Sequence, residues 1–235
     1  TKELAQKSEE LAEKNKDIMD SINYAKKIQK AILPEDRAIQ HGLRDSFVLY
    51  LPKDVVSGDF YWYGERGDIR VITAVDCTGH GVPGAFMSMI GSNLLSQIVL
   101  EKGVTDAGQI LENLNVGVQK ALKQGTDAQE TNDGMDISLC TINTATLEVK
   151  WAGAYNPLYL IRGGEVQKFK ADKYPIGGAH MELDRTYQTH TIQAEKDDAL
   201  YMFSDGFVDQ FGGPKGKKFM GKRFQRLLLD VHQQP

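Results

Sequence analysis

The sequence predicts an α+β fold, a sandwich of antiparallel sheets with flanking helices that follows one long N-terminal helix. Three observations lead to this prediction: a seven-residue apolar repeat near the start, short alternating apolar runs bounded by turn residues, and two longer apolar stretches inserted between those runs. Period-two alternation is typical of antiparallel sheets with one packed face. Helices inserted among such strands are expected to cover the sheets.

The N-terminal helix is predicted to run from Leu4 to Leu33, and Pro34 ends it because proline disfavours a helical residue before it. Its apolar residues recur at seven-residue spacing, at Leu4, Leu11, Ile18, Ala25 and Ile32. That spacing gives the helix one apolar seam. The helix either pairs with a second chain as a coiled coil or folds back on its own domain. A helix of roughly 45 Å has no core beside its N-terminal end, which favours a homodimer.

Beyond Pro34 the apolar residues mostly alternate with a period of two, which predicts strands joined by short turns. The strands are expected at Phe47–Leu51, Phe60–Tyr63, Ile69–Val75, Ile137–Ile142, Leu147–Ala152, Leu158–Arg162, Val166–Phe169, Tyr187–Ile192 and Ala199–Phe203. Glycine-containing turns at 66–68 and 162–164 support these boundaries. Helices are expected at Pro83–Leu100, Ala107–Leu122 and Phe219–Val231.

Length and composition favour one cytoplasmic globular domain with an extension. The chain has 235 residues, 41% of them hydrophobic, which is enough for a sizeable core, and no apolar run reaches the length of a membrane span. The formal charge of −4 gives no basic footprint for nucleic acid. Cys77 and Cys140 are expected to be reduced and unpaired, because two thiols without a recognisable secretory signal do not make a disulfide framework.

Three aspartates at the edges of apolar runs are the strongest functional indication in the sequence. Asp59 opens a run of aromatic residues, whereas Asp76 and Asp205 each end a run that would be buried in a sheet. Each aspartate alone is more typical of a turn or a helix cap. Together they indicate a site for Mg²⁺ or Mn²⁺, which prefer oxygen ligands, because a buried acid is costly unless it is paired or coordinated. Metal-assisted phosphoryl chemistry is the leading hypothesis.

Four short motifs follow one another along the chain, at Ser57–Tyr61, Asp76–Gly81, Ala152–Pro157 and Phe203–Asp209. At these residues the chain resembles the SpoIIE-type branch of the metal-dependent (PPM, protein phosphatase 2C-like) serine/threonine phosphatases, from about Lys26 to the C-terminus. The resemblance implies an αββα four-layer sandwich over residues 34–235 and a signalling or dimerisation helix over residues 1–33. The chain ends before the family's last strands, so the domain is expected to lack C-terminal strands and one metal-binding Asp. Tyr155 stands where the family usually has His.

The resemblance also assigns roles to individual residues. Asp76 is expected to bridge two divalent cations, Mg²⁺ or Mn²⁺, with Asp59 and Asp205 as ligands and the Cys77 carbonyl oxygen as a further ligand. Two such cations lower the pKa of a shared water, which then attacks phosphorus in line without a protein nucleophile. The Cys77 thiol is disfavoured as a nucleophile because no Arg follows it in a phosphate-binding loop.

His80 is the candidate general acid. It lies between two glycines, where the backbone can come close to a ligand, and it could protonate the leaving serine or threonine oxygen. The alternative is a hydrogen-bonded turn residue. Its position close to Asp76 in sequence keeps the catalytic role open.

Two further groups of charged residues have less specific interpretations. Asp133 and Asp136 either cap a turn and face solvent, or hold a weakly bound additional metal. Lys215, Lys217 and Lys218 lie in a glycine-rich flap after the last aspartate motif. They are either solvated loop residues or a docking element for a phosphorylated or acidic partner.

Three functions are compatible with the sequence. The first is a protein serine/threonine phosphatase regulated through its N-terminal helix and an upstream sensory domain; its substrate, by resemblance, is a phosphorylated anti-sigma-factor antagonist in a bacterial partner-switching pathway. The second is a catalytically silent dimeric signalling module that only binds partners. The third is a hydrolase of small phosphoesters. The intact set of three aspartates argues against the second function, and the lack of a nucleotide or sugar motif mildly disfavours the third.

Overall fold

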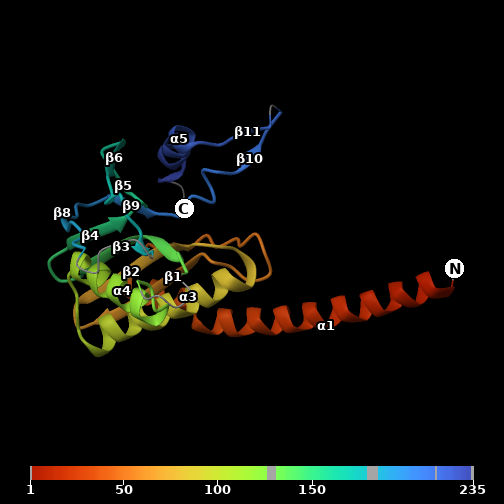
Figure 1. The fold of residues 1–235 in the computed structure, drawn as a ribbon. Helices are drawn as coiled ribbons and strands as arrows, with labels where there is room; N and C mark the ends of the chain where they lie inside the picture. The colour runs from red at the N-terminus through yellow and green to blue at the C-terminus, as the bar shows by residue number, and fades with distance from the viewer. Residues whose placement is uncertain (1, 126–130, 179–184, 215, 234–235) are drawn as a thin grey trace.

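The computed structural model describes residues 2–125, 131–178, 185–214 and 216–233 (Figure 1). Its helices are α1 (Lys2–Ile32), α2 (Asp36–Gly42), α3 (Gly81–Ser96), the short π-helix η1 (Gln97–Glu101), α4 (Ala107–Ala121) and α5 (Gly221–Val231). Its strands are β1 (Phe60–Arg66), β2 (Ile69–Cys77), β3 (Gly134–Asn143), β4 (Glu148–Ala154), β5 (Leu158–Arg162), β6 (Glu165–Phe169), β7 (Ile176–Gly177), β8 (His190–Gln193), β9 (Ala199–Met202), β10 (Phe211–Gly212) and β11 (Lys217–Lys218).

The larger sheet contains two of the strands next to the aspartates. Its strand order is β1-β2-β3-β4-β8, with β7 paired to β3, and every pair is antiparallel. In β2, the alternate residues Val71, Thr73, Val75 and Cys77 are buried, and the residues between them are only partly covered. The period-two pattern therefore decides which face of the sheet packs against α3 and α4.

The smaller sheet has the order β6-β5-β9 and is also antiparallel. Its central strand β5 is buried on both faces. Leu158 and Leu160 pack toward the larger sheet, whereas Tyr159 and Ile161 pack with Phe224 of α5. A strand covered on both sides reads as a continuous apolar run, which is what the sequence of β5 shows.

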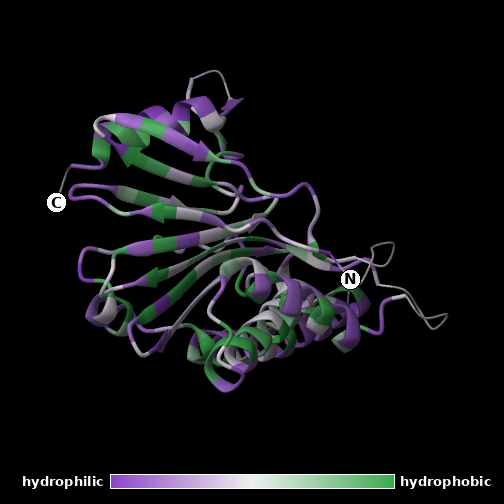
Figure 2. Ribbon diagram, turned by 90° about the vertical axis from the view of Figure 1, so that its left-hand side faces the viewer, coloured by the Kyte–Doolittle hydropathy of each residue, from purple (hydrophilic) through white to green (hydrophobic). Residues whose placement is uncertain are grey.

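Three clusters of buried apolar side chains lie between four layers. The first cluster joins α3 and α4 to the larger sheet and includes Leu111 and Ile137. The second lies between the two sheets and includes Trp151. The third joins the smaller sheet to α5. The layers are therefore helices, sheet, sheet and helix, as Figures 1 and 2 show from two sides, and the predicted αββα sandwich is confirmed.

The predicted strand at Phe47–Leu51 is wrong. Within the part of the chain that the structure describes, this segment pairs with no strand, and its alternate residues face solvent. Phe47, Leu49 and Leu51 are 74%, 63% and 82% exposed. Val48 and Tyr50 are partly buried, and the Tyr50 hydroxyl donates to the Asp59 carbonyl oxygen at 3.0 Å. Alternating apolar residues make a segment suited to a sheet, but a ladder also needs a free neighbouring edge.

Other boundaries differ from the predictions by a few residues. The strand predicted from Tyr187 begins at His190, because Tyr187 leaves the ladder and packs in the first core cluster with its hydroxyl donating to the Pro175 carbonyl oxygen. The helix predicted from Pro83 begins at Gly81, and its last turn is the π-helix η1. The short elements α2, β7, β10 and β11 were not predicted, since each is too short for a periodic pattern.

The segment Gly81–Glu101, formed by α3 and η1, is long and apolar enough by composition to cross a membrane. In this fold Leu95, Ile98 and Val99 are buried against the larger sheet. Half of the most apolar stretch is buried in this way, so the composition is that of a core helix.

Helix α1 leaves the sandwich and extends away from it (Figure 1). The first part of its apolar seam is uncovered: Leu4, Leu11 and Ile18 are 74%, 61% and 56% exposed. Near its C-terminal end Gln29 is buried, and Leu33, just after the helix, packs against the first core cluster. The helix is therefore attached to the domain only through its C-terminal part.

The chain just before β1 crosses the start of α3 at close backbone contact. A Cβ atom on Gly84 would lie 2.6 Å from the Gly79 carbonyl oxygen and 2.8 Å from Gly58 Cα. These are backbone atoms that cannot move without displacing the chain, so the crossing needs glycine. The contact holds the segment that carries Asp59 against the loop that follows Asp76.

Candidate metal centre

Asp59, Asp76 and Asp136 meet at one end of the larger sheet. Phe60 of β1 lies opposite Val75 of β2, so the next positions along the two chains, Asp59 and Asp76, face each other beyond the end of the ladder. Asp76 also lies opposite Asp136 in the β2–β3 ladder. Three carboxylates are therefore brought together by strand register alone.

The fourth carboxylate comes from the segment that follows β9 of the smaller sheet. Ser204 donates a hydrogen bond from its hydroxyl to Asp59 Oδ2 at 2.8 Å. Asp205 and Asp76 lie close enough for each to shift the pKa of the other. The candidate metal centre, defined here as Asp59, Asp76, Asp136 and Asp205, thus lies where the two sheets meet.

Burial and neighbouring negative charges raise the pKa of three of these carboxylates. Burial raises the pKa of Asp76 from 3.8 to about 8, and Asp59, Asp205 and Asp136 add to the rise because they disfavour another negative charge. Burial together with Asp205 raises the pKa of Asp136 to about 6. The pKa of Asp205 is raised by loss of solvent and by Asp209 and Asp59, against smaller opposing effects of Lys218 and Asp76. Without a cation, Asp76 holds a proton at neutral pH.

The donor chemistry of the centre fits divalent cations such as Mg²⁺ and Mn²⁺. Its side chains are hard oxygen ligands, and a bound cation would remove the repulsion that raises their pKa values. Among the described residues, however, no three acid, histidine or cysteine side chains are already gathered closely enough to hold one ion. These residues could supply the ligands, and their side chains would have to close around an ion that binds.

The side chain of Cys77 is part of the first core cluster. The thiol is 4% exposed and packs in the first core cluster, and burial raises its pKa well above the ordinary value, so it stays protonated. A buried neutral thiol is a poor nucleophile. The Cys77 carbonyl oxygen lies 3.1 Å from the position that a Cβ atom on Gly58 would occupy. This oxygen is therefore close to the segment that carries Asp59.

His80 follows Asp76 closely in sequence, but its side chain lies at the surface. Its side chain is 87% exposed, and Nδ1 lies 3.1 Å from Asp54 Oδ2. In the described part of the chain, His80 forms no hydrogen bond or ion pair with the four carboxylates. If Nδ1 of a neutral ring donates to Asp54, Nε2 is free to accept a proton and later to give it up.

Two of the other charged residues considered from sequence, Asp133 and Lys218, have defined partners. Asp133 accepts a hydrogen bond from Thr78 at 2.9 Å, so it fixes the loop after β2. Lys218 pairs with Asp209 at 2.6 Å. Lys217 is exposed, and Lys215 lies outside the described residues.

Sequence reasoning missed several residues that support the centre. Ser204, which bonds Asp59, was seen only as the residue before Asp205. Asp54, the partner of His80, lies in a loop without any pattern. Gln29 of α1 lies outside the predicted apolar seam, yet it is only 5% exposed. A polar residue whose partners are distant in sequence gives no periodic signal.

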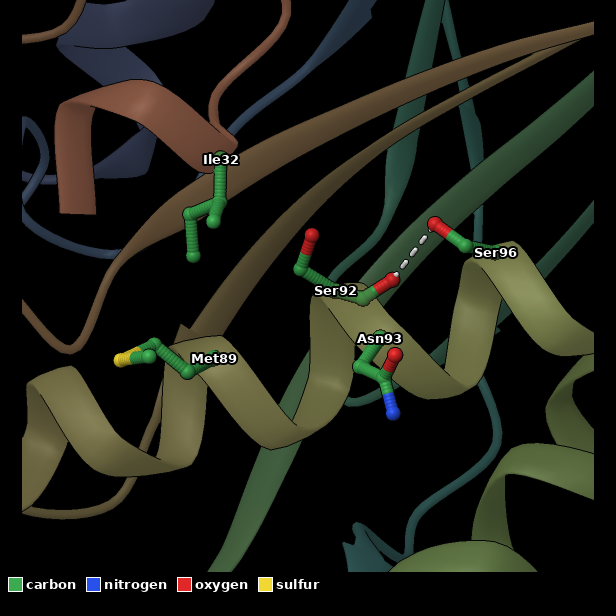
Figure 3. A pocket seen from close by; sticks show the side chains of 5 residues that line it. All are labelled: Ile32, Met89, Ser92, Asn93 and Ser96. Carbon is green, nitrogen blue, oxygen red and sulfur yellow. Dashed lines mark hydrogen bonds between the residues drawn. The ribbon is translucent and has the colours of Figure 1, made fainter. Parts of the chain in front are cut away.

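A cavity of about 460 Å³ lies between the end of α1 and α3 (Figure 3). It is lined by Ile32, Met89, Ser92, Asn93 and Ser96. None of these residues belongs to the candidate metal centre, so this cavity is not the proposed site of chemistry. It marks a loosely filled junction between the N-terminal helix and the domain.

Comparison with known proteins shows the family to which the chain belongs. The family profile described as Stage II sporulation protein E (SpoIIE) matches residues 67–235, and the chain therefore belongs to this family. It is 36% identical to the SiaA-PP2C domain of Pseudomonas aeruginosa, with a TM-score of 0.83, over 94% of this chain and 85% of that one. No curated protein sequence gives a significant match. The fold and family together define a PP2C-like phosphatase domain.

Two further solved structures are similar to this chain. The PP2C phosphatase domain of SpoIIE from Bacillus subtilis, solved with a fragment of its regulatory domain, is 26% identical with a TM-score of 0.57, over 75% of this chain and 47% of that one. The RsbU and RsbW domains of Rv1364c from Mycobacterium tuberculosis are 17% identical with a TM-score of 0.59, over 77% of this chain and 48% of that one. The second likeness concerns the fold alone.

The raised pKa of Asp76 predicts how the metal-free protein responds to pH. The group titrates near 3.8 in the unfolded chain and near 8 in the folded protein. The folded state therefore holds a proton that the unfolded state has released, and this contribution to stability is lost as the pH rises from about 4 to about 8. Asp76→Asn should raise the thermal unfolding midpoint in EDTA, with a gain that grows from pH 5 to pH 8 and then levels off.

Asp45→Asn is the matched control, because Asp45 is exposed on the loop after α2. Its unfolding midpoint should differ little from that of the unchanged protein at every pH. A gain for Asp76→Asn that does not depend on pH, or a loss of stability, would contradict the described charge cluster.

Proposed function

We propose that this protein is a metal-dependent protein serine/threonine phosphatase. The observation that supports the proposal most is the meeting of Asp59, Asp76, Asp136 and Asp205 at the junction of two sheets, with the pKa of Asp76 raised to about 8. Structural packing alone gives no reason to gather four acids there, since each raises the cost of ionising the others. PP2C-type phosphatases use Mg²⁺ or Mn²⁺, and this donor set suits those ions.

Each residue has a role in the proposed reaction. Two bound cations would lower the pKa of a water molecule and neutralise the phosphoryl oxygens. Asp76, at the middle of the cluster, would bridge them, with Asp59 and Asp205 as further ligands and the Cys77 carbonyl oxygen beside them. The buried thiol of Cys77 takes no part. His80, held by Asp54, would deliver a proton to the leaving serine or threonine oxygen after a movement toward the centre.

The proposed substrate is a phosphorylated protein in a bacterial partner-switching pathway. SpoIIE, which gives the family its name, is described as a cell fate determinant, and Rv1364c carries an RsbU and an RsbW domain. From the family resemblance, we propose an anti-sigma-factor antagonist as the substrate class. A pathway of this kind operates in the cytoplasm, and we assign the protein to that compartment.

We further propose that α1 joins two copies of the chain and connects them to an upstream sensory domain. The exposed seam of Leu4, Leu11 and Ile18 supports this, because a helix that projects from its domain with one apolar stripe suits a coiled coil. Regulation of the phosphatase would then act through the end of α1 that contacts the domain.

The phosphatase proposal is tested by Mn²⁺-dependent hydrolysis of a phosphoserine peptide and of p-nitrophenyl phosphate. The unchanged protein should favour the peptide. Asp76→Asn should lower the rate to background, because the bridging charge is lost. Asp59→Asn and Asp205→Asn should raise the Mn²⁺ concentration for half-maximal rate by at least the roughly 10–100-fold that loss of a supporting metal-site residue typically costs.

The control is again Asp45→Asn, which should keep the full rate. Full Mn²⁺-dependent rates in all three cluster variants would show that the metal assignment is wrong. Absence of hydrolysis with either substrate would favour the silent binding module, and a strong preference for p-nitrophenyl phosphate would favour a small-phosphoester hydrolase.

The dimer is tested by analytical ultracentrifugation of Leu11→Gln combined with Ile18→Gln. Burial of an apolar side chain of this size contributes roughly 1.5–3 kcal/mol, so the double change should raise the dimer dissociation constant by well over tenfold. Glu9→Gln combined with Lys16→Gln alters the same helix away from the seam and should leave the constant nearly unchanged. A monomer at high concentration for the unmodified protein would contradict the proposal.

A further inference from the structure

Gln29 is the only residue of α1 that the structure describes as fully buried, and it is polar. Its side chain is 5% exposed at the point where the helix meets the domain. Burying an amide is unfavourable unless its donors and acceptor find partners. The partners of Gln29 therefore indicate why this position is buried while most of the helix is in solvent.

The Gln29 amide bonds both backbone groups of one residue, Ser57. Nε2 donates to the Ser57 carbonyl oxygen at 2.6 Å, and Oε1 accepts from the Ser57 backbone N–H at 3.0 Å. Nε2 also donates to Ser88 Oγ of α3 at 2.9 Å. The side chain thus pairs with the Ser57 backbone as a neighbouring strand would. Through Ser88 it also connects Ser57 to α3.

Ser57 in turn fixes Asp59. The Asp59 backbone N–H donates to Ser57 Oγ at 3.0 Å, so the turn between the two residues is closed by the serine. The Asp59 carboxylate then accepts from Ser204 of the other sheet. Hydrogen bonds therefore connect Gln29 through Ser57 to the backbone of Asp59, the residue whose carboxylate faces Asp76.

Apolar packing alone does not fix α1 at this junction. Ile32 lines the cavity between α1 and α3 (Figure 3), and the α1 side chains near it are only partly buried. Hydrogen bonds are directional, whereas a partly filled apolar contact tolerates sliding. A shift of α1 by one residue turns each side chain by about 100° around the helix, which would carry the Gln29 amide away from Ser57.

We infer that Gln29 is a positioning residue through which the orientation of α1 sets the place of Asp59 in the candidate metal centre. With Gln29 bonded, Ser57 and Asp59 are held beside Asp76 and the centre can close around its cations. With α1 rotated or shifted, Ser57 loses its partners and Asp59 is free to move away. The inference rests on the proposed function, because it describes how the N-terminal helix regulates that same site.

The test measures Mn²⁺ affinity and hydrogen exchange in the full chain carrying Gln29→Met. Methionine keeps the length and volume of glutamine and removes all three hydrogen bonds. Calorimetric titration should show Mn²⁺ binding weakened at least tenfold. Exchange of the backbone amides of residues 57–60 in the metal-free protein should accelerate at least tenfold, while exchange in β3 and β4 stays unchanged.

Two controls separate positioning from general destabilisation. Gln6→Met makes the same change on the exposed part of α1 and should alter neither quantity. Ile192→Ala removes a buried side chain from the second core cluster; it should lower the unfolding midpoint at least as much as Gln29→Met and leave Mn²⁺ affinity within twofold.

Equal weakening of Mn²⁺ binding by Gln29→Met and Ile192→Ala would overturn the inference, and so would unchanged amide exchange at residues 57–60 in Gln29→Met. An unmodified protein that binds no Mn²⁺ would contradict the proposed function instead. In that case the exchange measurement alone decides whether Gln29 positions Ser57 and Asp59.

Discussion

Repulsion among carboxylates at the junction of the two sheets is the constraint on which the rest of the structure depends. Asp76 lies partly buried between Asp59 and Asp136, with Asp205 beside it, and the cost of ionising it raises its pKa to about 8. Such a cluster persists only if the surrounding fold holds it together or if cations neutralise it. Its presence in a well-packed domain is the physical basis for assigning the site to divalent metals.

The four-layer sandwich supplies the rigid support. Core clusters on both faces of each sheet fix the strands that end at the acids. Close backbone contact at Gly58 and Gly84 and the Ser204 bond to Asp59 then join the two sheets and α3 at one point. Helix α1 is different, since it contacts this region mainly through the polar side chain of Gln29. Breaking these hydrogen bonds costs less free energy than disrupting the packing of a hydrophobic core.

Much of the architecture could be predicted because it follows from local patterns. Burial is reflected in the alternation of β2, in the continuous apolar run of β5 and in the apolar run of α3. Asp59, Asp76 and Asp205 stand at the edges of apolar runs. The strand predicted at Phe47–Leu51 failed because alternation does not reveal whether a partner edge exists. Gln29 and Ser204 could not be found, since their roles arise from contacts with residues 28 and 145 positions away.

The central claim is that the four carboxylates form a centre for two divalent cations. Anomalous diffraction from crystals of the protein grown with Mn²⁺ tests it most directly, because it locates the ions independently of activity. The account predicts two anomalous peaks about 3.5–4 Å apart, with Asp76 between them and with Asp59 and Asp205 as ligands. Peaks elsewhere on the molecule, or none at saturating Mn²⁺, would contradict it.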